Sequence, residues 1–258
     1  MTAGWLMSAA FAVLGLAVGS FLNVCIHRIP KRVSIVWPAS RCAQCDRPLA
    51  WFENIPLVSY AALGGRCRTC RAGISIQYPL VEAITMIVFV LVLQIFGLDS
   101  ILIPRLLFAC VLIVLFAIDL EHQILPNVIT LPGIVAGFLC SLVWPPGPVS
   151  SLIGIAIGGG ILWLIAEVWL KFRGIEGMGF GDVKMLAMIG AFLGWKMVVL
   201  TFVLSSLLGG IIGIIVIASR RGKLATAVPF GTMLAVAAFV ASVQGDQLIQ
   251  WYLGRFAP

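Results

Sequence analysis

The chain has 258 residues, of which 61% are hydrophobic and only 10% are charged. A soluble domain of this length cannot cover its surface with so little charge, so the composition excludes that class and indicates an integral membrane protein. The net charge of +7 does not indicate nucleic-acid binding, because the basic residues lie in blocks beside hydrophobic runs, as in the cytoplasmic loops of membrane proteins.

Hydrophobic runs predict an all-α polytopic membrane protein with about eight transmembrane helices. The first run, 5–26, has basic residues after it rather than before it, so we interpret it as a retained helix with its N-terminus outside, not as a signal peptide. The later runs are 78–97, 101–118, 126–144, 149–171, 183–195, 196–218 and 226–245. Only 183–195 is clearly shorter than the ~20 residues that a spanning helix needs.

Residues 27–77 form the one sizeable polar region and carry eight of the seventeen Lys and Arg residues. The positive-inside rule places this loop, and the later basic loops, in the cytoplasm, where they attract anionic membrane lipid. Tight outer turns follow, including one at Gly194 and Trp195. We therefore predict three parts: a first transmembrane helix (1–26), a cytoplasmic loop (27–77) and a seven-helix membrane domain (78–258).

Four cysteines in the loop form two C-x2-C pairs separated by twenty-one residues: Cys42, Cys45, Cys67 and Cys70. This spacing in a reducing compartment is typical of a tetrahedral zinc site, and with four protein ligands the role is structural. Two disulfides are the alternative, and the cytoplasmic orientation argues against them. The other three cysteines lie in apolar runs and are interpreted as packing residues.

Two aspartates define the candidate catalytic site. Asp119 ends the third predicted helix, and Asp182 begins the sixth after a glycine-rich stretch that includes Gly179 and Gly181. The predicted topology puts both at the cytoplasmic membrane surface, where two close carboxylates can share one proton and perform aspartyl proteolysis. The ionised carboxylate activates water while the protonated one hydrogen-bonds the scissile carbonyl. The glycines allow close backbone approach and hinge motion.

Other interpretations of the aspartates remain open from the residues alone. A helix N-cap would explain Asp182. Asp119 at a helix C-terminus opposes the helix dipole, so capping does not explain it. A proton- or ion-coupled transporter using the same carboxylates is the main alternative, and a zinc-stabilised membrane scaffold is a third.

Several motifs in register resemble those of the prepilin peptidase family, the type IV leader peptidases. GMGFGDVKML at 177–186 is similar to the family's GxGD motif, which identifies Asp182. DLEHQILPN at 119–127 is similar to its D-L-x4-L-P-[DN] pattern, which identifies Asp119, with Asn127 where many relatives carry Asp. GSFLNVCIHRIP at 19–30, NIPLVSY at 54–60, YPLVE at 78–82 and PFG at 229–231 also match.

The resemblance implies an endopeptidase of the bacterial inner membrane that removes the basic leader from prepilins or pseudopilins of type IV pilus or type II secretion systems. It also implies that the enzyme methylates the new N-terminal residue, with S-adenosylmethionine as methyl donor. No glycine-rich loop of the Rossmann kind supports this second activity independently.

Three polar or small residues near the inner end of the first helix, Gly19, Ser20 and Asn23, fall at helical spacing. Such residues commonly mediate helix–helix packing and hydrogen bonding in membranes. Their face could instead line the substrate-binding site, and we retain both interpretations.

Overall fold

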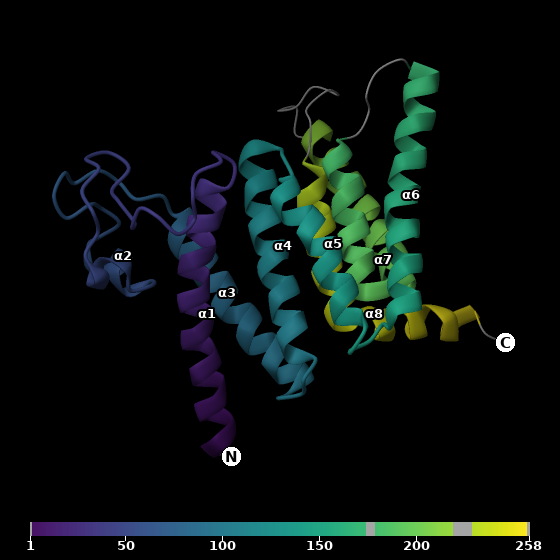
Figure 1. The fold of residues 1–258 in the computed structure, drawn as a ribbon, viewed down its shortest axis with the longest axis horizontal. Coiled ribbons are helices and arrows are strands. Elements are labelled where there is room, and N and C mark those ends of the chain that lie inside the picture. Colours follow the sequence, from purple (N-terminus) through teal and green to yellow (C-terminus); the bar gives the residue numbers. More distant parts are fainter. Residues whose placement is uncertain (1, 174–178, 219–228, 257–258) are drawn as a thin grey trace. The chain divides into compact units, whose positions relative to one another are not determined.

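The computed structural model describes residues 2–173, 179–218 and 229–256 (Figure 1). Within these residues the regular structure is helical, apart from isolated bridges between Arg41 and Pro48 and between Arg66 and Gly73. The predicted all-α class is confirmed. Two compact units divide the chain, Met1–Val114 and Leu115–Pro258.

The described residues form eight α-helices and one short 3₁₀ helix. Their bounds are α1 Thr2–Arg28, η1 Trp51–Asn54, α2 Val58–Ala62, α3 Gln77–Phe96, α4 Leu102–His122, α5 Asn127–Ser141, α6 Pro148–Arg173, α7 Phe180–Ala218 and α8 Phe230–Phe256. Six of the described helices are long and apolar enough to cross a membrane, and α5 is a shorter apolar helix. The chain is therefore a multi-pass membrane protein.

In the first unit, α1 and α3 pack as an antiparallel pair. The Asn23 side-chain amide donates to the Tyr78 carbonyl over 3.0 Å near the cytoplasmic end predicted for α1. Farther along, a methyl group added to Gly15 would lie 2.8 Å from the Met86 Cα. A glycine at this position therefore lets the two backbones touch, as small residues do between membrane helices.

In the second unit, α7 folds back on itself at Gly194. This residue has φ 79° and ψ 177°, a conformation outside the helical region that favours glycine. Gly158 of α6 lies against both Leu186 and Val198 of α7, which a continuous helix would separate by about 18 Å. The predicted turn at this point is confirmed, and with two legs in α7 the described residues contain eight apolar helical segments.

The core of the second unit lies between α6 and the two legs of α7. Leu162, Met185, Ile189 and Val198 are fully buried there. Glycines let α6 approach the α7 backbone so closely that a methyl group on Gly158 would collide with the Leu186 carbonyl. The tightness of this contact makes the helix pair sensitive to a single added carbon.

Replacing Gly158 by Ala is expected to lower the thermal unfolding midpoint of the detergent-purified protein, because α6 must move away from α7 at a cost of about 1–3 kcal/mol. Gly160→Ala is the matched control, since a methyl group at Gly160 meets no atom within 4 Å. Equal midpoints for the two variants would contradict the described packing.

Candidate functional site

Asp119 lies inside α4, one turn before its last residue, and is bound by the first residues of α8. The Thr232 backbone N–H donates to its Oδ2 over 2.8 Å, and the Gly231 N–H also donates to this carboxylate. Asp119 is 5% exposed and Thr232 is 1% exposed. The first N–H groups of a helix lack intrahelical partners and carry partial positive charge, so Asp119 caps the N-terminus of α8.

This contact corrects the expectation that capping does not explain Asp119. The expectation considered only the helix to which Asp119 belongs, whereas the helix that it caps begins far away in sequence. Thr232 is separated from Asp119 by 113 positions, so no local pattern could predict the pair. The available signal was the PFG motif at 229–231, which immediately precedes Thr232.

Leu125 fills the space between the starts of α7 and α8, and both helices meet it with glycine. A methyl group on Gly181 would lie 2.9 Å from the Leu125 Cβ, and one on Gly231 would lie 3.0 Å from its Cδ1 and 2.8 Å from Oδ2 of Asp119. Any side chain at Gly231 would therefore push the helix start away from the carboxylate. Leu125 belongs to the D-L-x4-L-P pattern, for which sequence analysis assigned a role only to Asp119.

Asp182 lies in the first turn of α7, half-buried, and its N–H donates to the Gly179 carbonyl over 3.1 Å. Its neighbour Gly181 lies against Leu125, as does Gly231, which borders Asp119, so the two aspartates lie at the same end of the unit. The structure thus brings together the two predicted catalytic side chains, from α4 and α7. Residues 177 and 178 of the glycine-rich stretch lie outside the described residues.

Lys184, one half-turn beyond Asp182, is held at the same end of the unit. Its ammonium group donates to the Asn127 side-chain oxygen over 2.8 Å and lies 5.5 Å from the centre of the Phe180 ring. Asn127 is the first residue of α5, so the starts of α5, α7 and α8 all face this end. The partial positive charges of these three helix N-termini favour negative charge here. Position 127 contributes no third carboxylate, because it is Asn rather than Asp.

The four loop cysteines converge as predicted. Their Sγ atoms all lie within 4.8 Å of one another, and those of Cys42 and Cys70 are 3.7 Å apart. Sulfur ligands at 2.3 Å around a tetrahedral zinc ion are about 3.8 Å apart, whereas an S–S bond is about 2.05 Å. The arrangement therefore fits one shared metal ion.

Backbone geometry prepares these thiols for a metal. The N–H groups of Cys70 and Thr69 lower the pKa of Cys67 to about 6. Those of Cys45 and Gln44 lower the pKa of Cys42 in the same way. Thiolate is the metal-binding form, so these N–H groups favour metal binding at Cys42 and Cys67. Desolvation and the neighbouring thiols instead raise the pKa of Cys70 to about 11, and a metal ion would have to displace its proton.

Gly19, Ser20 and Asn23 contact α3 in the first unit. A methyl group on Gly19 would lie 2.8 Å from the Glu82 Cα, the Ser20 hydroxyl donates to the Glu82 carboxylate, and Asn23 binds the Tyr78 carbonyl. Helix packing and hydrogen bonding account for all three. Their share in substrate binding stays a prediction.

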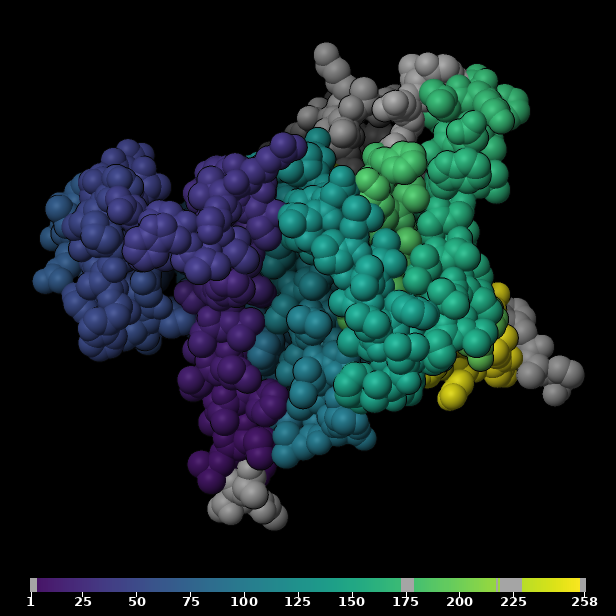
Figure 2. Space-filling view, viewed as in Figure 1, coloured from purple at the N-terminus to yellow at the C-terminus, as the bar shows by residue number. Residues whose placement is uncertain are grey.

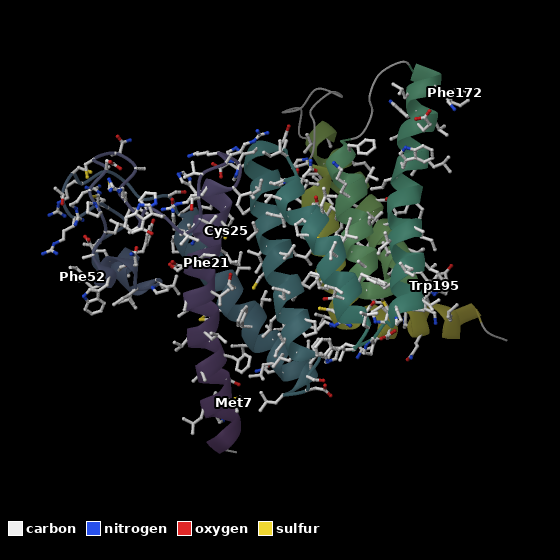
Figure 3. All side chains as sticks on the ribbon, viewed as in Figure 1. Met7, Phe21, Cys25, Phe52, Phe172 and Trp195 are labelled. Atoms are coloured by element: carbon white, nitrogen blue, oxygen red, sulfur yellow. The ribbon has the colours of Figure 1, made fainter. Side chains whose placement is uncertain are left out.

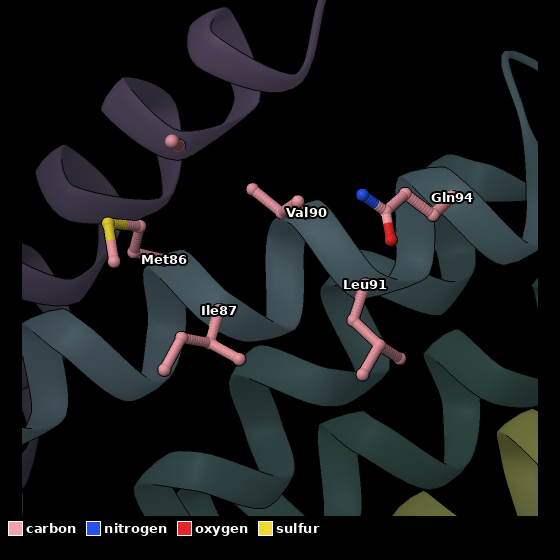
Figure 4. Close-up of a pocket in the computed structure, with 6 residues that line it drawn as sticks. Met86, Ile87, Val90, Leu91 and Gln94 are labelled. Carbon is pink, nitrogen blue, oxygen red and sulfur yellow. The ribbon is translucent and has the colours of Figure 1, made fainter. Parts of the chain in front are cut away.

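A shallow groove between α1 and α3 carries none of this chemistry. It is lined by Ala12, Met86, Ile87, Val90, Leu91 and Gln94 (Figure 4). Without an ionisable or nucleophilic side chain the groove cannot be a catalytic site, so the carboxylate pair and the cysteine cluster remain the two candidate centres.

Two known families match most of the chain. Residues 13–96 match the bacterial peptidase A24 N-terminal domain, and residues 106–214 match the type IV leader peptidase family. The second match contains both Asp119 and Asp182, and the first contains the cysteine loop.

Similar proteins cover nearly the whole chain. A prepilin leader peptidase/N-methyltransferase from Pseudomonas aeruginosa is 39% identical, over 93% of this chain and 91% of its own length. The protein of that name from Aeromonas salmonicida is 37% identical over 96% and 94%. One from Myxococcus xanthus is 42% identical over 83% of this chain and 64% of its own length. No solved structure shows significant similarity.

The cap on α8 predicts how Asp119 variants fold. Asp119→Leu leaves the buried Thr232 N–H without its acceptor, which is expected to destabilise the protein by about 1–3 kcal/mol. Asp119→Asn keeps a side-chain oxygen for this bond and should unfold at nearly the wild-type temperature. Thermal unfolding in detergent compares the three proteins, and a Leu variant as stable as the Asn variant would contradict the cap.

Proposed function

This chain belongs to the type IV leader peptidase family, and from that membership we propose the following activity. The enzyme is a membrane aspartyl endopeptidase that removes the basic leader from type IV prepilins or pseudopilins, and it then N-methylates the new N-terminal residue. The observation that carries the first activity is the meeting of Asp119 and Asp182, from two different helices, at one end of the second unit.

The environments of the two aspartates support different roles in this proposal. Asp119 receives N–H donors from Thr232 and Gly231, which compensate negative charge at the start of a helix. Asp182 has no such donor among the described residues, and Asp119 lies close to it. Asp119 is therefore the ionised member of the pair, and Asp182 holds the shared proton.

The cut then follows the general acid–base scheme of paired carboxylates. Asp119 takes a proton from the attacking water while Asp182 hydrogen-bonds the scissile carbonyl oxygen. The resulting tetrahedral intermediate collapses when the leaving amine receives a proton from the pair, which returns to its singly protonated state. The positive ends of α5, α7 and α8 favour the negative charge that develops during this step.

The depth of Asp119 and Asp182 in the membrane suits a substrate in which a polar leader precedes an apolar membrane helix. Both aspartates lie in terminal turns of apolar helices. Positive-inside counting places that end of the second unit at the cytoplasmic face of the bacterial inner membrane. A basic leader in the cytoplasm, attached to an apolar helix in the bilayer, presents its scissile bond at this depth.

The methyl transfer is proposed from the names of the relatives, which join both activities. The resemblance to these relatives implies S-adenosylmethionine as the donor. When bound, it would supply an electrophilic methyl group for the free amine that proteolysis leaves behind, so cleavage would come first.

For the cysteine loop we propose one structural Zn²⁺ ion held by Cys42, Cys45, Cys67 and Cys70. Their mutual distances and the lowered pKa values of Cys42 and Cys67 support this assignment. With all four ligands from the protein no position is open for substrate. The metal's role is to hold a loop that is too small to form a hydrophobic core of its own.

Incubation of the purified enzyme with a prepilin-like peptide, followed by mass spectrometry, tests both activities. Wild type should release the leader, and with S-adenosylmethionine the product should gain the mass of one CH₂ group. Asp119→Asn and Asp182→Asn should each abolish release while the protein stays folded, since neither can complete a singly protonated pair.

Asp99→Asn is the control for these variants, because the Asp99 carboxylate lies in the turn before α4 and accepts hydrogen bonds from its neighbours Ser100 and Ile101. Substantial cleavage by either catalytic-site variant would refute the pair. The scaffold interpretation predicts that these substitutions have no effect on processing.

Metal analysis of the purified enzyme should find one zinc ion per chain. Cys67→Ser should lose it and lower the unfolding temperature, because the loop loses its cross-link. Cys110→Ser should retain the metal, since Cys110 lies within α4 away from the cluster. A metal-free protein with four reduced loop thiols would disprove the zinc assignment.

A further inference from the structure

The cysteine loop is attached to the transmembrane helices at two different depths. Its early part is bound by Arg28 at the last residue of α1, whose guanidinium donates to Pro38 over 2.7 Å and to Ser34 over 2.9 Å. Its middle part is bound much lower, where the Leu57 N–H donates to the Glu82 carboxylate over 2.9 Å.

The level of the second attachment can be read along α1. Glu82 of α3 packs against Gly19 of α1. A methyl group added to Gly19 would lie only 2.8 Å from the Glu82 Cα. Gly19 is nine residues before Arg28, which corresponds to about 13 Å along a helix. With Arg28 at the membrane surface, Leu57 lies below the headgroups, because each headgroup layer is only about 5–8 Å thick.

The neighbouring residues expose apolar side chains at this depth. Trp51 is 79% exposed, Val58 is 61% exposed and Phe52 is 41% exposed. Figure 3 shows Phe52 level with Phe21, a residue inside the apolar part of α1. In the space-filling view the loop, in blue, lies beside the upper part of α1, in purple, rather than beyond its end (Figure 2).

Several polar groups of this segment have partners, as groups at membrane depth require. Glu53 pairs with Arg47 over 2.7 Å and accepts the Ala50 N–H over 2.8 Å. Ser59 and Ala61 donate backbone hydrogen bonds to Ile55 and Leu57 over 3.0 Å. Large apolar side chains therefore point outward, with Asn54 also exposed among them, while Glu53 and the Leu57 N–H have partners inside.

The charges around the segment favour lipid over other partners. Arg66, Arg68 and Arg71 are exposed, and the Arg68 guanidinium lies 5.5 Å from the centre of the Phe52 ring. Aromatic side chains next to arginines are typical of proteins at the interface of an anionic membrane, where long arginine side chains reach phosphate groups.

We propose that residues 51–58 insert into the lipid leaflet on the side of the cysteine loop, with Trp51, Phe52 and Val58 among acyl chains and the nearby arginines at anionic headgroups. The loop is then an interfacial membrane element rather than a domain standing in water. This inference does not depend on the catalytic proposal, because it rests only on contacts within the first unit.

Fluorescence quenching of the full chain in nanodiscs of brominated phosphatidylglycerol tests the insertion. The contribution of Trp51 is the emission that Trp51→Phe removes, measured in brominated and unbrominated lipid. Bromine on the acyl chains should quench most of this contribution, and aqueous iodide should quench little of it.

Trp37 is the matched control, since it is 76% exposed but adjoins Pro38, which Arg28 holds at the surface. The contribution that Trp37→Phe removes should show the opposite pattern, with quenching by iodide. Quenching of Trp51 by iodide instead of bromine would place the segment in water. Quenching of Trp51 by neither agent would mean that protein covers this side chain. Equal bromine quenching of Trp51 and Trp37 would show that the two side chains lie at the same depth. Each of these three results would overturn the proposal.

Discussion

The hydrogen bonds from the start of α8 to Asp119 are the constraint on which the candidate site depends. A carboxylate that is 5% exposed in an apolar helix bundle needs compensation for the loss of water, and the free N–H groups of a helix start supply it. That contact requires glycine at 231, where a methyl group would lie 2.8 Å from the carboxylate oxygen. It also brings together α4 and α8 beside Asp182 on α7, so that one interaction serves both stability and chemistry.

The same demand for internal partners shapes the rest of the structure. Ser151 of α6 donates to the Ala191 carbonyl over 2.8 Å, and Thr201 donates to the Met197 carbonyl of its own helix over 2.8 Å. In a bilayer no water can replace such partners. Glu82 is the notable case, because a loop backbone N–H satisfies it, and the loop is thereby held at membrane depth.

Sequence analysis predicted the features that local patterns encode. The hydropathy pattern predicted the apolar helices, and the glycine at 194 predicted the turn there. The spacing of the four cysteines predicted that they cluster. Helix ends were less predictable: α8 continues to Phe256, beyond the expected 245, because its last turns are only moderately apolar. The cap on α8 and the depth of Leu57 escaped prediction for one physical reason. Each is a contact between distant segments, and neither periodicity nor composition specifies such a partner.

The order of residues in the loop links the cysteine cluster to the membrane contact. Cys45 precedes and Cys67 follows the apolar residues 51–58, so a metal ion at the cluster closes a ring that contains them. Closing a ring reduces the conformational freedom of the residues within it. Glu82 fixes this ring to α3 at Leu57, and Arg28 binds the chain just before it, at Ser34 and Pro38. A metal ion held by the four cysteines would therefore restrict the orientation of the apolar side chains, so a local cross-link would influence what the protein presents to the lipid.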